Sequence, residues 1–249
     1  MTGEHYLSLE SLAKDMLDFL ASAVRGKVNI LVSGGTSTGK TTLLNMLSTY
    51  IPNNELIVTI EDSCELQLRQ MNVRRMETRQ SVAEGLMPIT TQTLVKNALR
   101  MRPDRIIVGE IRDGTIVDMM SAMSTGHEGS MSTVHANGPG NLMNARMPIL
   151  YGMNEHMKFS QDTQSLQISE AIQLIVHISR LSNGKRKITH ITEVAGLTER
   201  GRVKIEDVFR YNEEKDEFVA TGYTPVKTLA RMKNNGITVD EAIFSKEGA

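Results

Sequence analysis

Short runs of apolar residues alternate with helix-patterned segments along the first two thirds of the chain. Three of these runs, at residues 28–32, 56–60 and 106–108, are typical of buried strands in a parallel sheet, although Asn29 interrupts the first. The segments between them have helical spacing, and a further short strand is expected at 73–76. The helices are expected at residues 8–25, with Ser8 as the N-cap, from Lys40 onward, at 90–102 and at 115–124. This alternation predicts an α/β domain with a mainly parallel sheet.

The pattern changes from about residue 174, where β-type segments follow one another with turn residues between them. The pair Asn183-Gly184 is a strong hairpin signal, and Arg200-Gly201 marks another turn. A closing helix at 225–233 and a short helix at 238–244 complete the chain. We therefore expect residues 1–184 to form the α/β core with a leading helix, and residues 185–249 to form an extension of the same domain made of β-hairpins and small helices.

The segment between the first strand and the following helix has the spacing Gly34-x-x-x-x-Gly39-Lys40-Thr41, which is the P-loop pattern. Glycines let the backbone turn its N–H groups toward a polyphosphate, and the helix that follows adds its positive dipole end. Lys40 is expected to reach the β- and γ-phosphates, and the Thr41 hydroxyl to hold Mg²⁺. The predicted nucleotide-binding residues are Gly35, Thr36, Ser37, Thr38, Gly39, Lys40, Thr41 and Thr42.

Carboxylates follow two of the expected strands. Glu110 comes directly after the third apolar run, where the second acidic motif of P-loop enzymes is expected. Glu61, Asp62 and Glu65 follow the second run, and any of the three could orient the attacking water or act as its base. Their spacing leaves that choice open.

Histidines and arginines supply further candidates. His127 and His135 flank a segment rich in hydroxyl side chains and could bond to a γ-phosphate or respond to it. Arg74, Arg79 and Arg112 belong to a region with many arginines, and an arginine from a neighbouring subunit often stabilises the transition state of phosphoryl transfer.

Charge and cysteine content limit the classes of partner and compartment. The chain has 28 Lys and Arg against 29 Asp and Glu, so its formal charge is -1 and no overall basic bias points to nucleic acid. The single cysteine, Cys64, excludes an internal disulfide. No run resembles a secretory signal or a span of about 20 apolar residues. These features predict a soluble cytosolic protein without a specific nucleic-acid partner.

Four segments together resemble the secretion ATPase superfamily, which powers type II and type IV secretion and type IV pili, and most closely its TadA/CpaF branch of Tad (Flp) pilus assembly ATPases. In chain order they are SGGTSTGKTTLLN, VTIEDSCELQL, NALRMRPDRIIVGEIRD and TGHEGSMSTVHAN. They match the family's Walker A motif, Asp box (residues 60–66), atypical Walker B motif and His box (residues 126–137). The resemblance extends from about Leu7 to the end of the chain and implies a RecA-like P-loop ATPase core.

The resemblance also implies roles for individual residues. Glu65 becomes the favoured catalytic glutamate, Glu110 holds Mg²⁺ or its waters, and His135 senses the γ-phosphate. The remaining assignments are supporting ones: His127 beside His135, Arg112 as the arginine after the Walker B glutamate, and Arg74 and Arg79 in contacts across a subunit boundary. The implied partners are ATP, Mg²⁺, further copies of the chain in a hexamer, and platform proteins at the inner face of the inner membrane.

The chain departs from the family pattern in two places. Asp113-Gly114-Thr115 follows Arg112, where the branch often has glycine and then an acidic residue. Family members also usually carry a larger N-terminal domain before the P-loop, so the sequence fits an isolated motor domain or a short natural version, and for either we expect weak turnover and poor hexamer formation by this chain alone.

Two other functions fit the P-loop. A nucleic-acid-translocating motor is disfavoured by the near-neutral charge, since binding a polyphosphate backbone relies on many Lys and Arg contacts. A non-hydrolysing, nucleotide-dependent scaffold is disfavoured by the presence of both Glu65 and Glu110.

Overall fold

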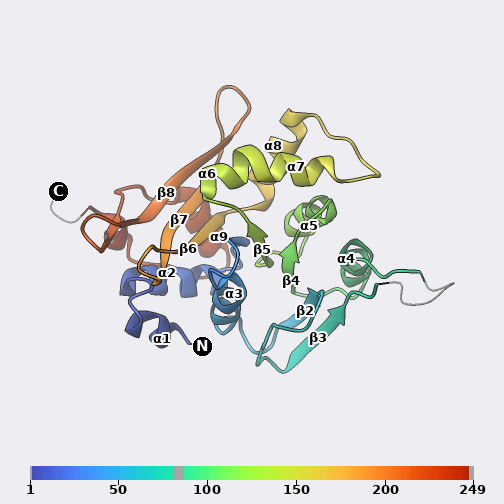
Figure 1. Cartoon of the computed structure of the whole chain (residues 1–249), viewed down its shortest axis with the longest axis horizontal. Helices are drawn as coiled ribbons and strands as arrows, with labels where there is room; N and C mark the ends of the chain where they lie inside the picture. The colour runs from blue at the N-terminus through green and yellow to red at the C-terminus, as the bar shows by residue number, and fades with distance from the viewer. Residues whose placement is uncertain (1, 81–86, 247–249) are drawn as a thin grey trace.

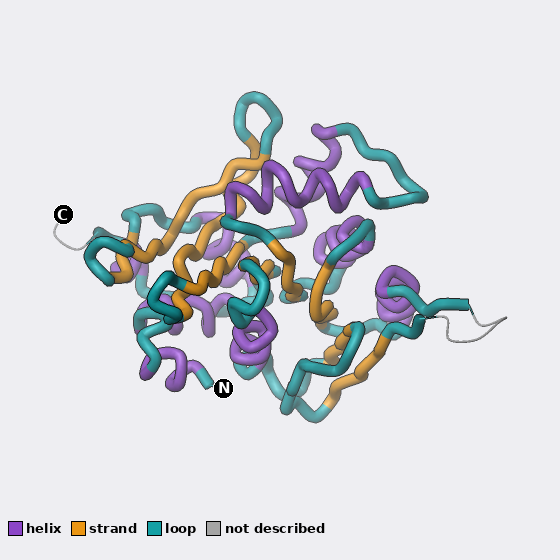
Figure 2. Tube along the Cα trace, viewed as in Figure 1, coloured by secondary structure: helices purple, strands orange, loops and turns teal. Residues whose placement is uncertain are grey.

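A computed structural model describes residues 2–80 and 87–246, which are built around one large sheet (Figures 1 and 2). Within these residues the sheet has nine strands in the order β3-β2-β4-β5-β1-β6-β7-β8-β9. The strands are β1 (Ile30–Gly34), β2 (Leu56–Glu61), β3 (Asn72–Glu77), β4 (Arg105–Ile111), β5 (Met131–His135), β6 (Leu174–Arg180), β7 (Arg186–Leu197), β8 (Val203–Asn212) and β9 (Glu217–Ala220).

The direction of pairing changes once across the sheet. All pairs from β3 to β6 are parallel, whereas β6, β7, β8 and β9 pair antiparallel in sequence. The strands β1, β2, β4, β5 and β6 therefore all end on the same side of the sheet. We call this row of strand ends the carboxyl edge. This arrangement confirms the predicted α/β fold with a mainly parallel sheet and antiparallel C-terminal hairpins.

Helices cover both faces of the sheet. One face is covered by α1 (Gly3–Ser8), α2 (Lys14–Arg25), α3 (Lys40–Ser48) and α9 (Val226–Asn234), and the other by α4 (Thr91–Arg100), α5 (Thr115–Ser124), α7 (Met147–Gly152) and α8 (Gln161–Ala171). A short α6 (Pro139–Asn141) and a π-helical turn (Leu142–Arg146) lead into α7, and a 3-10 helix (Glu241–Phe244) lies near the C-terminus. Among the described residues, no helix combines the length and the apolar character needed to cross a bilayer.

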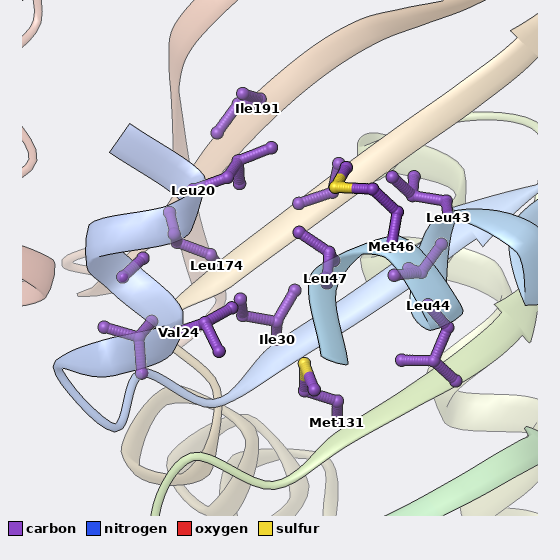
Figure 3. Packing of buried hydrophobic residues seen from close by; sticks show 14 of the residues in the cluster. Leu20, Val24, Ile30, Leu43, Leu44, Met46, Leu47, Met131, Leu174 and Ile191 are labelled. Atoms are coloured by element: carbon purple, nitrogen blue, oxygen red, sulfur yellow. The ribbon is translucent and has the colours of Figure 1, made fainter. Parts of the chain in front are cut away.

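The hydrophobic core beneath α2 and α3 fixes the two elements that flank the P-loop, β1 and α3. Leu20 and Val24 of α2 and Leu47 of α3 point toward Ile30 and Leu174, which lie on the neighbouring strands β1 and β6 (Figure 3). All five side chains are fully buried. Burying one such side chain stabilises a fold by roughly 1.5–3 kcal/mol, so this cluster fixes α3 firmly against the strand that precedes it.

The leading helix expected at residues 8–25 is confirmed from Lys14 to Arg25 as α2, but its expected start is wrong, because a break separates α2 from the short helix α1. Ser8 ends α1 and donates its hydroxyl to the carbonyl of His5, so it is not an N-cap. The chain turns at Glu10, where φ is +52°, and the Ser11 carbonyl accepts a hydrogen bond from the N–H of Ile188 in β7. Contact with a distant strand therefore interrupts a segment whose apolar spacing is continuous.

Other expected elements are confirmed. The helix expected at 115–124 is α5, and Thr90 caps α4 by accepting the N–H of Thr93. The Asn183-Gly184 pair lies in the turn between β6 and β7, where Gly184 has φ +82°. No helix was expected for residues 138–172, which contain α6 to α8.

Candidate nucleotide-binding site

The loop between β1 and α3 has the backbone conformation of an anion-binding cradle. Ser37 and Gly39 have φ of +59° and +99°, a region that favours glycine. A Cβ added at Gly34 would lie 2.4 Å from the Ile178 carbonyl and 2.7 Å from the Thr38 hydroxyl, so only glycine fits there. The N–H groups at the start of α3 therefore open onto a concave loop.

Lys40 is held inside this loop. Its ammonium donates to the carbonyl of Gly35 over 2.9 Å, and Thr38 donates its hydroxyl to the same carbonyl over 3.0 Å. Partial burial lowers the pKa of Lys40, and the nearby Glu110 carboxylate opposes that shift. A cation kept partly out of water interacts strongly with an incoming anion, as a phosphate-binding lysine must.

The acidic segment after β2 is folded into a tight turn by its first carboxylate. Glu61 is 5% exposed, and its Oε1 accepts the backbone N–H groups of Glu65 (3.0 Å) and Leu66 (2.9 Å). Burial raises the pKa of Glu61, although these two hydrogen bonds oppose the shift. Glu65, by contrast, is exposed. The turn thus buries one glutamate and presents another.

A bulge in β4 turns Glu110 toward the same region. The register of β4 against β5 shifts between Val108 and Ile111, and Thr133 donates its hydroxyl to the carbonyl of Gly109 over 2.7 Å. Arg112 then donates to Glu110 over 2.8 Å and lies 3.6 Å from a carboxylate oxygen of Asp62. The hydrogen bond to Glu110 raises the pKa of Arg112. Arg112 therefore links the two acidic segments.

One cavity of about 860 Å³ opens at the carboxyl edge and brings most of the predicted residues together. Its lining includes Thr36, Ser37, Gly39, Lys40, Thr41, Thr42, Glu65, Glu110, Arg112 and His135. His135 reaches the cavity because β5 pairs in parallel with β1, which places His135 beside Gly34. Segments separated by up to a hundred residues thus converge on the P-loop.

Seven predicted residues do not line that cavity: Gly35, Thr38, Glu61, Asp62, Arg74, Arg79 and His127. Glu61 and Asp62 line a smaller adjoining cavity of about 230 Å³, which also borders Thr41, Glu65 and Glu110. Arg74, on the edge strand β3, and Arg79, just after it, are exposed and border none of the cavities described here. In this structure of a single chain, these two arginines therefore make no contribution to the nucleotide cavity.

His127 lies at the opposite edge of the sheet from His135. It precedes the start of β5, and its carbonyl accepts a hydrogen bond from the Ser130 hydroxyl over 2.6 Å. The N–H of Ser130 in turn donates to the side chain of Asn29, the residue directly before β1. The two histidines of this segment consequently do not meet at one site, because strand β5 separates them.

The other wall of the cavity was not predicted from the sequence. Tyr6, Leu9 and Ser11 from the N-terminal segment line it together with Ile178, Gly184, Lys185 and Arg186 from the β6–β7 hairpin. The guanidinium of Arg186 donates to the carbonyl of Ser37 over 3.4 Å. The only sequence signal in this region was the Asn183-Gly184 turn. That turn lies near the P-loop because β6 pairs with β1, a pairing that the sequence pattern does not indicate.

Two histidines, the buried His177 and the half-buried His190, lie between the P-loop strand and the antiparallel half of the sheet. The side chains of Ser33 and His177 share a hydrogen bond of 2.8 Å, and the His177 ring packs 6.0 Å from that of His190. Burial lowers the pKa of His177 to about 4, with further contributions from His190 and Lys40. His177 is therefore neutral near pH 7.

The residues at the cavity fit a magnesium ion that shares its coordination with a nucleotide. The Thr41 hydroxyl and the Glu110 carboxylate both line the cavity, and Mg²⁺ usually takes one or two protein oxygens together with phosphate oxygens and waters. Among residues 2–80 and 87–246, no group of three or more His, Cys, Asp or Glu side chains could hold a metal unaided. The donor set thus suits a nucleotide-bound metal.

Comparison with known proteins agrees with this geometry. The model of the family described as type II/IV secretion system protein matches residues 3–247. The type IV secretion system protein VirB11 of Bartonella quintana is 44% identical over 134 residues, which are 54% of this chain and 37% of that protein. The crystal structure of the VirB11 ATPase from Brucella suis, in complex with sulphate, has a TM-score of 0.64 at 28% identity and covers 76% of this chain and 54% of that one.

A structure of the pilus retraction motor PilT with bound ADP is similar as well. Its TM-score is 0.56 at 27% identity, over 73% of this chain and 50% of PilT. The match to this chain thus spans about half the length of each of these two solved structures. It spans 37% of the length of the Bartonella protein. Because the family model covers nearly all of the chain and the sheet matches these RecA-like ATPases, the chain belongs to the type II/IV secretion ATPase superfamily.

Proposed function

We propose that this chain binds ATP and hydrolyses it as the motor domain of a pilus-assembly or protein-secretion ATPase. The observation that carries the proposal is the single cavity lined by Lys40, Thr41, Glu65, Glu110 and His135. The relatives support the same class of activity, since one is described as an ATPase of a type IV secretion system and another as a pilus retraction motor with bound ADP.

Each residue has a distinct task in this proposal. Lys40 and the N–H groups at the start of α3 hold the β- and γ-phosphates and stabilise the negative charge that spreads over them during transfer. Glu65 orients the attacking water and accepts its proton as the water oxygen bonds to the γ-phosphorus. The bond from that phosphorus to the β–γ bridging oxygen breaks in the same step, which releases ADP and inorganic phosphate. His135 lies at the carboxyl end of β5, where it can bond to the γ-phosphate. Arg112 keeps the Glu110 carboxylate in place.

Thr41 and Glu110 would hold Mg²⁺, with Glu110 acting directly or through water. When bound, this ion would neutralise charge on the β- and γ-phosphates.

The coupling of hydrolysis to work requires further copies of the chain and other proteins. We propose a ring, a hexamer when the N-terminal domain is present, in which Arg74 and Arg79 contact the next subunit. Its partners would be platform proteins at the cytoplasmic face of the inner membrane, and its output pilin extrusion or protein export. Membership of the Tad branch stays a prediction from the sequence.

Hydrolysis of ATP by the purified chain tests the proposal. We expect Lys40→Ala to weaken ATP binding and Glu65→Gln to retain binding, each lowering phosphate release by about 100-fold or more. Wild-type rates in both variants would overturn the ATPase assignment. Stimulation by DNA with a steep salt dependence would instead favour the nucleic-acid motor, and tight binding without any phosphate release would favour the scaffold.

A further inference from the structure

The turn that carries Glu65 is held from two sides. On one side, Glu61 accepts the N–H of Glu65, as described above. On the other side, Asn45 of α3 donates its Nδ2 to the carbonyl of Glu65 over 3.2 Å, and its Oδ1 accepts the N–H of Gln67 over 2.7 Å. Both partners of Asn45 are backbone groups, so the carbonyl must face Nδ2 and the N–H must face Oδ1.

The position of Asn45 on α3 gives this contact a functional meaning. Asn45 lies four residues after Thr41, one helical turn along the helix whose first residues form the phosphate site. The same rigid helix therefore carries the groups that hold the phosphates and the side chain that holds the backbone of Glu65. The Glu65 side chain itself is exposed, so where its carboxylate sits depends on where its backbone is fixed.

We propose that Asn45 is a positioning residue that sets the distance between the Glu65 carboxylate and the bound γ-phosphate. The inference rests on the proposed function, because it concerns the hydrolysis step of that site. Misplacing a catalytic group by about 1 Å can cost about 100-fold in rate. Loss of the Asn45 contact should thus slow hydrolysis while leaving the phosphate cradle, and so nucleotide affinity, intact.

The chain supplies a matched control a few residues further along the same segment after β2. Gln70 donates its Nε2 to the carbonyls of Ser48 (2.7 Å), the last residue of α3, and Ile51 (3.2 Å), just after the helix. It therefore also ties the segment after β2 to α3 by a side-chain amide, but it borders none of the cavities described above. A general loosening of the segment would affect both variants, whereas, of these two residues, only Asn45 bonds to the backbone of Glu65.

The test is single-turnover ATP hydrolysis with protein in excess, together with calorimetric titration of a non-hydrolysable ATP analogue. For Asn45→Ala we expect the hydrolysis rate to fall about 10- to 100-fold while the dissociation constant changes by less than about twofold. Asn45→Asp should behave similarly, because it keeps an acceptor for Gln67 but loses the donor to Glu65. Gln70→Ala should keep both values within about twofold of wild type.

Two further measurements separate positioning from a general loss of structure. Amide hydrogen exchange at Gln67 should accelerate in Asn45→Ala, because that N–H loses its partner. In a Glu65→Gln background, Asn45→Ala should lower the residual rate by less than about twofold, since its effect acts through the missing carboxylate.

Three results would overturn the inference: a wild-type hydrolysis rate in Asn45→Ala, an equal loss in Gln70→Ala, or a full Asn45→Ala effect added to that of Glu65→Gln. Failure of the proposed function gives a different result, since wild type would then hydrolyse ATP no faster than Lys40→Ala.

Discussion

At the scale of single residues, the stability of the chain depends on the buried imidazole of His177, which is neutral and bonds to the P-loop strand. His177 is 4% exposed and shares a hydrogen bond with Ser33, the residue directly before Gly34. Its pKa of about 4 lies below the value of 6.5 for a free histidine. Since the folded chain binds this proton less readily than the unfolded chain, the contribution of His177 to stability is present above pH 6.5 and is lost as pH falls toward 4.

This linkage predicts a stability difference that depends on pH. Asn places a polar atom near the position of Nδ1 but does not titrate, so His177→Asn should lack this component. Between pH 7.5 and 4.5, we expect the free energy of unfolding of wild type to fall by about 2–3 kcal/mol more than that of His177→Asn. Urea denaturation at the two pH values measures this, and equal losses in both proteins would refute it.

The close approach at Gly34 gives a second prediction at this scale. In Gly34→Ala the new Cβ would meet the Ile178 carbonyl, which the pairing of β1 with β6 holds in place. We expect a stability loss of about 1–3 kcal/mol and at least about tenfold weaker ATP binding, measured by denaturation and calorimetry. Gly140→Ala is the control, because a Cβ there meets nothing within 4 Å. Equal affinities in wild type and Gly34→Ala would contradict the steric argument.

At the scale of elements, a buried arginine joins three segments at the edge of the sheet opposite the cavity. Arg105, the first residue of β4, is fully buried and forms a two-pronged ion pair with Glu55. It also donates to the carbonyls of Val24 at 2.7 Å and Gly129 at 3.2 Å. One guanidinium therefore connects α2, the residues before β2 and the loop before β5.

Removing this arginine should leave a buried, unpaired carboxylate. We expect Arg105→Met to lower the free energy of unfolding by about 3–5 kcal/mol, and the double variant Arg105→Met with Glu55→Met to recover part of that loss. A double-mutant cycle by chemical denaturation measures the coupling. A double variant that loses the full sum of the two single losses would show that the pair acts independently.

Elements with one continuous apolar pattern could be predicted from the sequence, and elements set by distant contacts could not. The strand β2 and the helix α5 follow directly from such runs, and so do the P-loop and Glu110, which come at strand ends. The break between α1 and α2 could not be predicted, because a hydrogen bond to Ile188 in β7 fixes it. Lys185 and Arg186 were missed for the same reason, since only the pairing of β6 with β1 brings them to the cavity.

At the scale of the whole molecule, β3 ends the sheet on one side with an exposed strand (Figure 1). Arg74 and Arg79 are exposed there and line no part of their own chain's nucleotide cavity. If they act in a neighbouring subunit, their effect must depend on association.

We therefore expect Arg74→Ala and Arg79→Ala to leave the ATP affinity of the isolated chain unchanged. Their ATPase rate per chain should rise less with protein concentration than that of wild type, because only associated chains would use these side chains. Titration of protein concentration in the ATPase assay, with light scattering in parallel, measures this. Identical concentration dependence in all three proteins would exclude a role across the subunit boundary.

The change from parallel to antiparallel pairing at β6 also decides where a reporter group can be attached. Successive hairpin turns fall on alternate edges of the sheet, so the turn at 181–185 borders the nucleotide cavity, whereas the turn at 198–202 lies at the far edge. The exposed Cys64 would first be replaced by serine. A dye on a cysteine introduced at Lys185 should then change its emission when ATP binds. The emission of the same dye on a cysteine introduced at Glu199 should not respond to ATP, so that position can be used to immobilise the chain or to follow its assembly.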